Sequence, residues 1–421
     1  MRRVVHLENL DRQVVVQASE AEPRNMGADL MVLTDGRWLM GYSRWLGGAH
    51  DDDGSQICGM LSDDGGDTWS TPFAIALRPD GVEAVRMPCF LRLKDGRLAC
   101  FYRVRETHLD TWTGMIICRD ETRLSEPGAG PELWTDPVRI SPPAPGRHVL
   151  LNNRALRLQQ GPHAGRILLP LASPWPWDEE DRRGTHIRSW VLYSDDDGAT
   201  WQPSQSMLEG PERGLMEPYL MEHPDGRVRM WMRTQMDCQY ESISSDGGNS
   251  WSPATPGPLV SPESPVAVAR HEASGMLMIV WNHNRRGKHT ADRTPIGVAF
   301  SEDEGDSWFG EHTLDPHNGD RVVPAGDGEP ANTGSVGAVQ AGGESGHSVA
   351  ANPGAGEPGE ADDPGRVSQG DGRSSDSRSG DSRSFSYPGA HFLGDRGIVT
   401  YYENAGGRIS LIVRRFDLRL D

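Results

Sequence analysis

Four short segments of this chain repeat one pattern, and that pattern constrains the fold more than any other feature. Each segment reads S-x-D-x-G-x-[ST]-W, and the copies occupy residues 62–69, 194–201, 244–251 and 301–308. Ser and Asp side chains can bond turn amides, Gly accepts a positive φ, and Trp buries a large apolar face. We therefore expect each copy to staple a β-hairpin, and the repetition predicts a fold built from similar units.

A second repeat consists of a turn centred on glycine that is followed by an apolar strand. Asp-Gly between alternating apolar runs is a strong hairpin signal. In four units the staple begins 18 to 29 residues after the turn glycine, so the turn and the staple belong to one repeating unit. The units that begin with Gly96 and Gly394 carry no recognisable staple. The six turns centre on Gly36, Gly96, Gly165, Gly226, Gly275 and Gly394.

One interval between these turns is too long for a single unit. Residues 311–384 contain no Phe, Tyr, Trp or Ile, and Gly, Ser, Pro, Asp and Ala dominate the segment. Such a composition cannot bury enough surface to offset its ordering entropy, so we expect a disordered insertion before the last unit. The remaining chain gives about 58 residues to each of six units, a size that suits a four-stranded blade.

The sequence therefore predicts an all-β fold, namely a six-bladed β-propeller of four-stranded antiparallel blades. The propeller forms one domain over residues 1–421, with residues 311–384 inserted before the last blade. Apolar strands occur near both ends of the chain. Because propellers hide their sheet edges, we expect a strand from one terminus to complete the blade begun at the other.

Charge and composition exclude several classes of function. The formal net charge of -19 repels nucleic acid and anionic lipid, so neither is an expected partner. The five cysteines form no C-x-x-C pair and the histidines form no H-E-x-x-H motif, which predicts reduced thiols and no metal or cofactor. No apolar run is long enough for a membrane span or a signal peptide, so the expected location is the cytoplasm.

Catalytic residues should differ between the blades, because aspartates repeated in every staple cannot converge on one centre. We expect them near the inner strands around the central channel. The staples resemble the Asp-box, and the chain resembles the sialidase (neuraminidase) superfamily, in particular its bacterial BNR-repeat branch. This resemblance covers nearly all of the chain outside the insertion.

The resemblance implies three arginines that hold the substrate carboxylate, and their places match Arg24, Arg233 and Arg293. A planar guanidinium makes bidentate, charge-assisted bonds to a carboxylate. Glu403, in TYYEN, resembles the carboxylate that braces the first arginine. The family's R-I-P signature is similar to the triplet that begins at Arg86 in the second blade, where we expect no catalytic role.

The resemblance also implies an acid/base and a nucleophile pair. The acid/base is an Asp between the first Gly turn and the first staple, where Asp51 has the closest spacing, Asp53 competes and Asp52 is third. Glu217, in GLMEPYL, and Tyr387, in SFSYPGAHF, resemble the family's Glu and nucleophilic Tyr. A phenol suits this role because the substrate carboxylate would repel an anionic nucleophile.

The resulting hypothesis is a retaining exo-glycosidase of the sialidase type that hydrolyses terminal α-linked sialic acid, or a related carboxylated sugar, without a cofactor. One alternative is an exo-glycosidase of different sugar specificity that uses Glu217 and Asp51 directly as its carboxylate pair. Another is a non-catalytic glycan-binding propeller, in which Trp175 and Trp177 would stack on sugars. The Tyr387 hydroxyl discriminates the first two, since only sialidase chemistry needs it.

Overall fold

The computed structural model describes residues 3–51, 53–107, 110–142, 146–174, 186–284, 292–316 and 383–421. The chain divides into two compact units, Met1–Ala331 with Ser379–Asp421, and Asn332–Arg378. All described residues belong to the first unit, and the second lies outside them. Within the described ranges no helix is long and apolar enough to cross a membrane.

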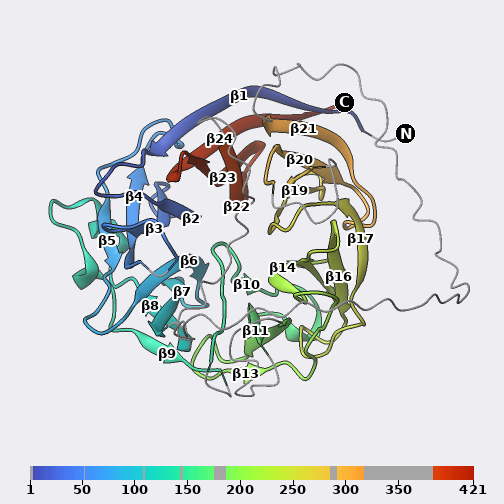
Figure 1. Ribbon diagram of the computed structural model, residues 1–421, viewed down its shortest axis with the longest axis horizontal. Coiled ribbons are helices and arrows are strands. Elements are labelled where there is room, and N and C mark those ends of the chain that lie inside the picture. Colours follow the sequence, from blue (N-terminus) through green and yellow to red (C-terminus); the bar gives the residue numbers. More distant parts are fainter. Residues whose placement is uncertain are drawn as a thin grey trace, which may run out of the picture. The chain divides into compact units, whose positions relative to one another are not determined.

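The first unit is a β-propeller whose four-stranded antiparallel sheets, or blades, stand in a ring (Figure 1). The described ranges contain six blades, which confirms the predicted fold class. Blade I is β2 (Asn25–Val32), β3 (Trp38–Trp45), β4 (Ser55–Ser62) and β5 (Phe73–Ala76); blade II is β6 (Ala84–Arg92), β7 (Leu98–Thr107), β8 (Asp110–Ile117) and β9 (Val138–Ile140); blade III is β10 (Leu156–Arg157), β11 (Ile167–Pro174), β12 (Ile187–Ser194) and β13 (Gln202–Pro203).

The other three blades have the same order from the innermost strand outward. Blade IV is β14 (Met216–Glu222), β15 (Val228–Arg233), β16 (Cys238–Ser244) and β17 (Thr255–Val260); blade V is β18 (Ala267–Arg270), β19 (Leu277–Asn282), β20 (Ile296–Ser301) and β21 (Phe309–Asp315); blade VI is β22 (Arg383–Leu393), β23 (Arg396–Ala405), β24 (Arg408–Leu420) and β1 (Val5–Val16). The described connections contain three short 3₁₀ helices, η1 (Glu121–Ser125), η2 (Pro131–Leu133) and η3 (Gly161–His163).

The ring closes through the N-terminal strand, as the closure argument predicts. Strand β1 pairs antiparallel with β24 and forms the outer edge of blade VI, with Val5 opposite Leu420. Asp315, at the end of β21, accepts hydrogen bonds from Arg12 of β1 at 3.1 Å and from Arg414 of β24 at 2.7 Å. This carboxylate therefore ties blade V to both terminal strands of blade VI.

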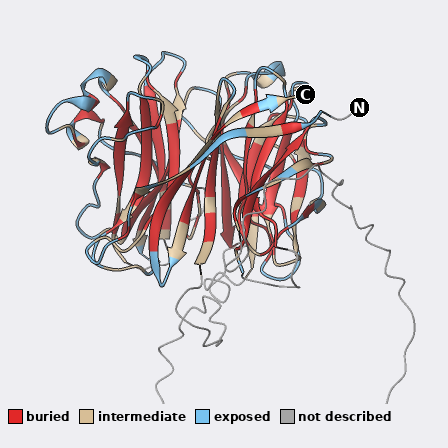
Figure 2. Ribbon diagram, turned by 90° about the horizontal axis from the view of Figure 1, so that it is seen from above, coloured by how far each residue is buried: buried red, intermediate tan, exposed pale blue. Residues whose placement is uncertain are grey.

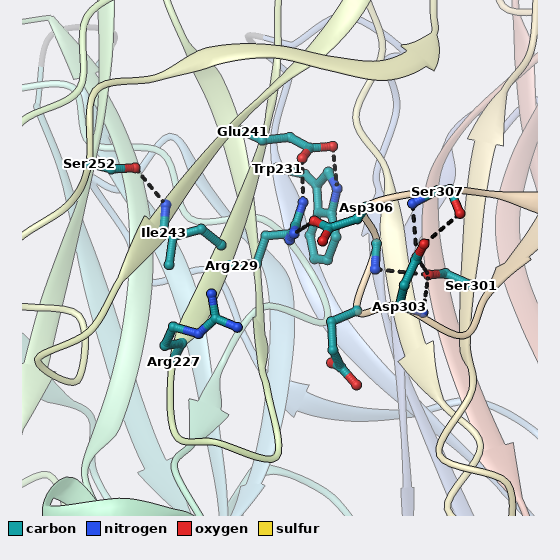
Figure 3. Close-up of polar contacts among 12 residues, drawn as sticks. Arg227, Arg229, Trp231, Glu241, Ile243, Ser252, Ser301, Asp303, Asp306 and Ser307 are labelled. Carbon is teal, nitrogen blue, oxygen red and sulfur yellow. Dashed lines mark hydrogen bonds and ion pairs between the residues drawn. The ribbon is translucent and has the colours of Figure 1, made fainter. Parts of the chain in front are cut away.

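Each of the six glycine turns joins the innermost strand of a blade to its second strand, and each glycine has a positive φ. Each staple joins the third strand to the fourth, in blades I, III, IV and V. In blade V, the Asp303 carboxylate accepts hydrogen bonds from Ser301 Oγ, from the Ser307 amide and from Ser307 Oγ, at 2.6–2.8 Å (Figure 3). The other three staples repeat these bonds, so one short motif sets four turns.

The staple of blade V also fastens its blade to blade IV. Arg229 of β15 pairs with Asp306 of the staple and donates a hydrogen bond of 2.6 Å to Glu241 of β16, which also accepts one from the Trp231 indole (Figure 3). A Cβ on Gly305 would lie 2.8 Å from the Trp231 ring. The staple glycine therefore allows the turn to lie against the neighbouring blade.

Apolar side chains fill the spaces between neighbouring blades. Leu39 and Ile57 of blade I, for example, pack with Leu98 and Cys100 of blade II, and all four are essentially inaccessible to solvent. Buried residues run along the strands while exposed residues lie mainly in the turns (Figure 2). The five cysteines are free thiols, in agreement with the sequence prediction.

The predicted insertion differs from the structure at both of its ends. Residues 311–315 belong to β21 and residues 383–384 begin β22, so the segment 311–384 is shorter than its composition suggested. The reason is that an outer strand needs few apolar residues, and β21 packs only Phe309 and Leu314 against the core while its other side chains are polar. Residues 317–382 lie outside the described residues.

Candidate active site

Four of the innermost strands in the described residues carry a bulge with one residue at positive φ. Pairing registers shift in β2, β6, β14 and β22, and the residues at positive φ there are Gly27, Met87, Glu217 and Tyr387. A positive φ is costly for a residue other than glycine, and such strain concentrates at functional sites. Glu217 and Tyr387 therefore occupy equivalent positions on blades IV and VI.

Glu217 and Tyr387 meet each other directly. The Tyr387 hydroxyl donates a hydrogen bond of 2.9 Å to Glu217 Oε1, and Arg233 donates one of 2.8 Å to Oε2 of the same carboxylate. Burial alone would raise the pKa of Glu217, but the charges of Arg233 and Arg293, with the hydrogen bonds from Arg233 and Tyr387, together lower it. Burial and the Glu217 charge raise the pKa of Tyr387 above its usual value. The resting pair is thus a neutral phenol beside an ionised carboxylate.

Arg293 also lies near Tyr387. Its guanidinium is 5.8 Å from the centre of the Tyr387 ring and donates a hydrogen bond of 3.1 Å to the hydroxyl of Tyr402. Tyr402 in turn stacks on Tyr387, with ring centres 5.8 Å apart. Glu263 accepts a hydrogen bond of 3.0 Å from Arg233, and its carbonyl accepts two from Arg293.

Glu263 and Tyr402 were not among the residues predicted from the sequence. Glu263 lies in the segment SPESP before β18, and its carboxylate pairs with Arg213 at 2.6 Å and with Arg233 at 3.0 Å. Tyr402 stands next to Glu403, the residue that was predicted instead.

Arg24 and Asp51 form a further ion pair near Tyr387. Arg24 lies over the Trp45 ring at 4.5 Å and pairs with the Asp51 carboxylate at 2.8 Å. The Asp51 side chain is 52% exposed. Partial burial would raise the pKa of Asp51, but Arg24, Arg86 and Arg103 together lower it to about 2.

One apolar cluster connects this ion pair with Tyr387. Trp45, Tyr402, Met26, Met87, Leu151 and Ile409 are packed together, and Tyr387 lies against them. Asp51 is near enough for its charge to raise the pKa of Tyr387 further. The structure therefore brings together the following residues that were predicted from the sequence: Arg24, Asp51, Glu217, Arg233, Arg293 and Tyr387.

The candidates next to Asp51 have different surroundings. The Asp53 carboxylate accepts a hydrogen bond of 2.7 Å from the His50 amide and packs against Gly48, so it shapes its own loop. Asp52 lies outside the described residues, as do Trp175 and Trp177. These contacts favour Asp51 over Asp53 as the group that faces the arginines.

Glu403 does not brace Arg24 in this structure. Its carboxylate pairs with Arg12 at 3.0 Å and with Arg383 at 3.1 Å. Neighbouring residues of a strand point to opposite faces, so Tyr402 points to the cluster and Glu403 points away from it. The sequence motif located the right strand and selected the wrong face.

Arg86 has a closer relation to the site than its motif suggested. Its guanidinium donates a hydrogen bond of 2.7 Å to the Asp51 carbonyl, which also accepts one of 3.0 Å from Arg105. The Asp51 loop is thus held by blade II, although its sequence belongs to blade I.

A buried polar network lies among the inner strands. Asn153 donates a hydrogen bond of 2.8 Å to Asp29, and its carbonyl oxygen accepts one of 3.0 Å from Tyr219. His391 lies 3.4 Å from the Asp29 carboxylate. Burial raises the pKa of Asp29 to about 6 and lowers that of His391 to about 4. In the described ranges, no group of three or more His, Cys, Asp or Glu residues could hold a metal ion.

Comparisons with known proteins agree with this architecture. A model of the BNR repeat-like domain family matches residues 41–398. The anhydrosialidase of Macrobdella decora is 30% identical over 102 residues, which are 24% of this chain and 12% of that protein. The aligned segment is thus a small part of that relative.

Solved structures show the same fold at low sequence identity. A protein of unknown function from Dyadobacter fermentans is 18% identical, and the alignment covers 99% of each chain with a TM-score of 0.60. The sialidase of Trypanosoma rangeli in complex with the inhibitor DANA is 12% identical, with a TM-score of 0.63 over 97% of this chain and 60% of that chain.

Proposed function

Since this chain belongs to the BNR repeat-like domain family, we propose that it is a retaining exo-glycosidase of the sialidase type. Its substrate would be a glycoside of terminal α-linked sialic acid or of a related carboxylated sugar. The observation that carries the proposal is the hydrogen bond from the Tyr387 hydroxyl to Glu217, whose carboxylate is fixed by Arg233.

This pair has the features of an activated nucleophile. A phenol attacks poorly until a base takes its proton, and Glu217 is ionised and within hydrogen-bond distance. A neutral phenol can approach an anomeric carbon that carries a carboxylate, whereas an anionic nucleophile would be repelled. The geometry therefore favours a tyrosine nucleophile over direct attack by Glu217.

Three arginines from three blades offer a receptor for the sugar carboxylate. Arg24, Arg233 and Arg293 are side chains of different blades, and they lie around the cluster that contains Tyr387. The substrate carboxylate would displace Asp51 from Arg24. Asp51 would then lose a stabilising positive charge, and its pKa would rise toward that of a proton donor.

The proposed reaction conserves its protons through these groups. Tyr387 Oη bonds to the anomeric carbon, its proton passes to Glu217, and Asp51 protonates the departing glycosidic oxygen as that bond breaks. Water then gives a proton to Asp51 and bonds to the same carbon. Tyr387 leaves and recovers its proton from Glu217, and two inversions give net retention.

The testing experiment is release of 4-methylumbelliferone from its α-sialoside by the purified protein and by Tyr387→Phe, beside a panel of other aryl glycosides. Release that is lost in the Phe variant supports the proposal. Turnover of another sugar by both proteins would instead support a carboxylate-pair glycosidase. Binding of glycans without any turnover would identify a non-catalytic propeller.

A further inference from the structure

Blade II and the segment that follows it place four arginines beside Asp51. Arg86 comes from β6, Arg103 and Arg105 from β7, and Arg147 from the connection to blade III. Arg86 and Arg105 bind the Asp51 carbonyl, and Arg103 is near enough to affect the Asp51 charge. The cluster is therefore continuous with the proposed active site.

Two members of this cluster oppose each other in the sheet. Arg86 on β6 pairs in register with Arg103 on β7, and the two residues are only 2% and 6% exposed. Like charges directly opposite each other in a sheet are destabilising, and burial increases the repulsion. Such a pair is expected to persist only where a ligand or a partner compensates it.

The described residues offer little compensation. Arg105 pairs with Glu83 at 2.7 Å, and the Asp51 carboxylate lies 2.8 Å from Arg24 and 4.0 Å from Arg86. The described part of the chain shows no hydrogen bond or ion pair for the guanidinium of Arg103 or that of Arg147. The Nε atoms of Arg86 and Arg103 are buried without a hydrogen-bond acceptor.

The electrostatics of the cluster agree with its geometry. Burial lowers the pKa of Arg103 far below its usual value, and the charges of Arg86, Arg147 and Arg105 lower it further. Burial and Arg105 likewise lower the pKa of Arg147. A bound anion would relieve this repulsion. Solvent has access to the cluster, since Arg147 is only partly buried and Asp51 is half exposed.

The carboxylate of a simple sialoside does not account for these residues. In the proposed function that carboxylate is held by Arg24, Arg233 and Arg293. We propose that Arg86, Arg103 and Arg147 form a second anion site, so that the preferred substrate carries a second anionic group, a carboxylate or a sulfate ester, besides the carboxylate at its anomeric carbon. The claim about the substrate rests on the proposed function, whereas the claim that an anion binds at this site does not depend on it.

The anion site can be tested without any activity. Inorganic sulfate is added to the full-length protein in a chloride-poor buffer, and the melting temperature is measured for wild type, Arg103→Gln, Arg147→Gln and Arg97→Gln. Arg97 is an exposed residue of blade II that pairs with Asp95, and it serves as the matched control. We expect sulfate to stabilise wild type and Arg97→Gln, and to stabilise the other two variants much less.

The variants also report on the repulsion itself. Without sulfate, Arg103→Gln should melt at a higher temperature than wild type, because it removes one of two opposed buried charges. Equal sulfate stabilisation in wild type and in both cluster variants would overturn the proposal, since sulfate would then bind elsewhere as an adventitious ion only. If Arg103→Gln does not fold, Arg147→Gln decides the question.

The second test uses three substrates for the same protein. These are a sialoside of neutral lactose, a sialic acid α-linked to a second sialic acid, and a sialoside with a sulfate ester on the sialic acid ring. A second anion in the leaving group or on the ring should lower KM by about 10-fold, and Arg103→Gln should abolish that difference. Equal KM values for all three would overturn the inference and leave the proposed function intact. No turnover of any of them would contradict the proposed function, while the sulfate result would still stand.

Discussion

The hydroxyl of Tyr387 lies 2.9 Å from the Glu217 carboxylate, although the two residues are 170 positions apart in the chain. They meet because blades IV and VI carry bulges at equivalent places on their innermost strands. A β-bulge changes the direction of a single side chain, and the two bulges together bring the side chains of Glu217 and Tyr387 into contact.

Replacing Tyr387 with Phe should reduce kcat on an aryl α-sialoside by about 10³-fold or more, because the nucleophilic oxygen is lost. Tyr193→Phe is the matched control, since its hydroxyl bonds Gln202 on the outer strands of blade III. Steady-state kinetics of both variants check the prediction. A Phe variant with wild-type kcat would exclude Tyr387 as the nucleophile.

Glu217→Gln should lower kcat by about 10²-fold or more, since an amide cannot take the phenolic proton. The variant also leaves Arg233 with Glu263 as its nearby carboxylate, so some loss of thermal stability is expected. Glu222→Gln, at the other end of the same strand, is the control for the loss of a carboxylate. If both variants slowed the reaction equally, the base would have to be another residue.

Asp51→Asn should affect substrates according to their leaving groups. An alkyl or sugar alcohol needs a proton as it departs, whereas 4-methylumbelliferone is acidic enough to leave with little help. We expect a loss of about 10²-fold or more on sialyllactose and a much smaller loss on the aryl sialoside. Asp53→Asn should not show this difference, and a leaving-group effect there would reverse the assignment.

The buried pair of Asp29 and His391 should give opposing pH dependences of stability. The pKa of Asp29 is raised from 3.8 to about 6, so the native state keeps a proton that the unfolded chain loses, and stability falls as pH rises through this window. The pKa of His391 is lowered from 6.5 to about 4, so the unfolded chain binds the extra proton and stability rises over nearly the same range.

Each titration changes the free energy of unfolding by about 3 kcal/mol across its pH window. The two changes have opposite signs, so they largely cancel in the wild type. Asp29→Asn should leave the rising slope of His391, and His391→Gln should leave the falling slope of Asp29. Urea unfolding midpoints measured between pH 4 and pH 6.5 check both signs. Parallel pH profiles for the two variants would contradict these pKa shifts.

The staples should act on stability and not on catalysis. Asp303→Ala removes the acceptor of three hydrogen bonds and should lower the free energy of unfolding by about 1–3 kcal/mol. Glu302→Ala, in the same turn, is the control, since its carboxylate makes one partly exposed ion pair. Denaturant unfolding and KM measured on both variants separate the two effects.

The fold could be predicted from the sequence because its signals are local and repeated. A glycine turn and a staple each specify their own hairpin, and six repetitions at blade spacing leave few architectures other than a propeller. The ends of the long insertion could not be predicted, because the outer strand β21 buries one side of a mostly polar segment. Its composition resembles that of a loop although its pairing is that of a strand.

The sequence motifs indicated Tyr387 and Glu217 as a pair, and the structure places these two side chains in hydrogen-bond contact. The site was not predictable where the choice lies between neighbours in a strand, because a shift of one residue exchanges the two faces, as at Tyr402 and Glu403. The arginines of blade II were missed for another reason. Their relation to Asp51 exists only between blades, and no spacing along the chain records it.

The pairing of β1 with β24 has a mechanical consequence. Val4 and Asp421 exchange two backbone hydrogen bonds of 3.1 Å, so the residue before β1 and the residue after β24 lie side by side. A force that pulls Val4 and Asp421 apart acts perpendicular to β1 and β24. It loads the hydrogen bonds between these strands one at a time, instead of shearing all of them together. The ring should therefore open at low tension along the pairing of β1 with β24. Strand β1 should peel away from blade VI before any of the other blades unfolds.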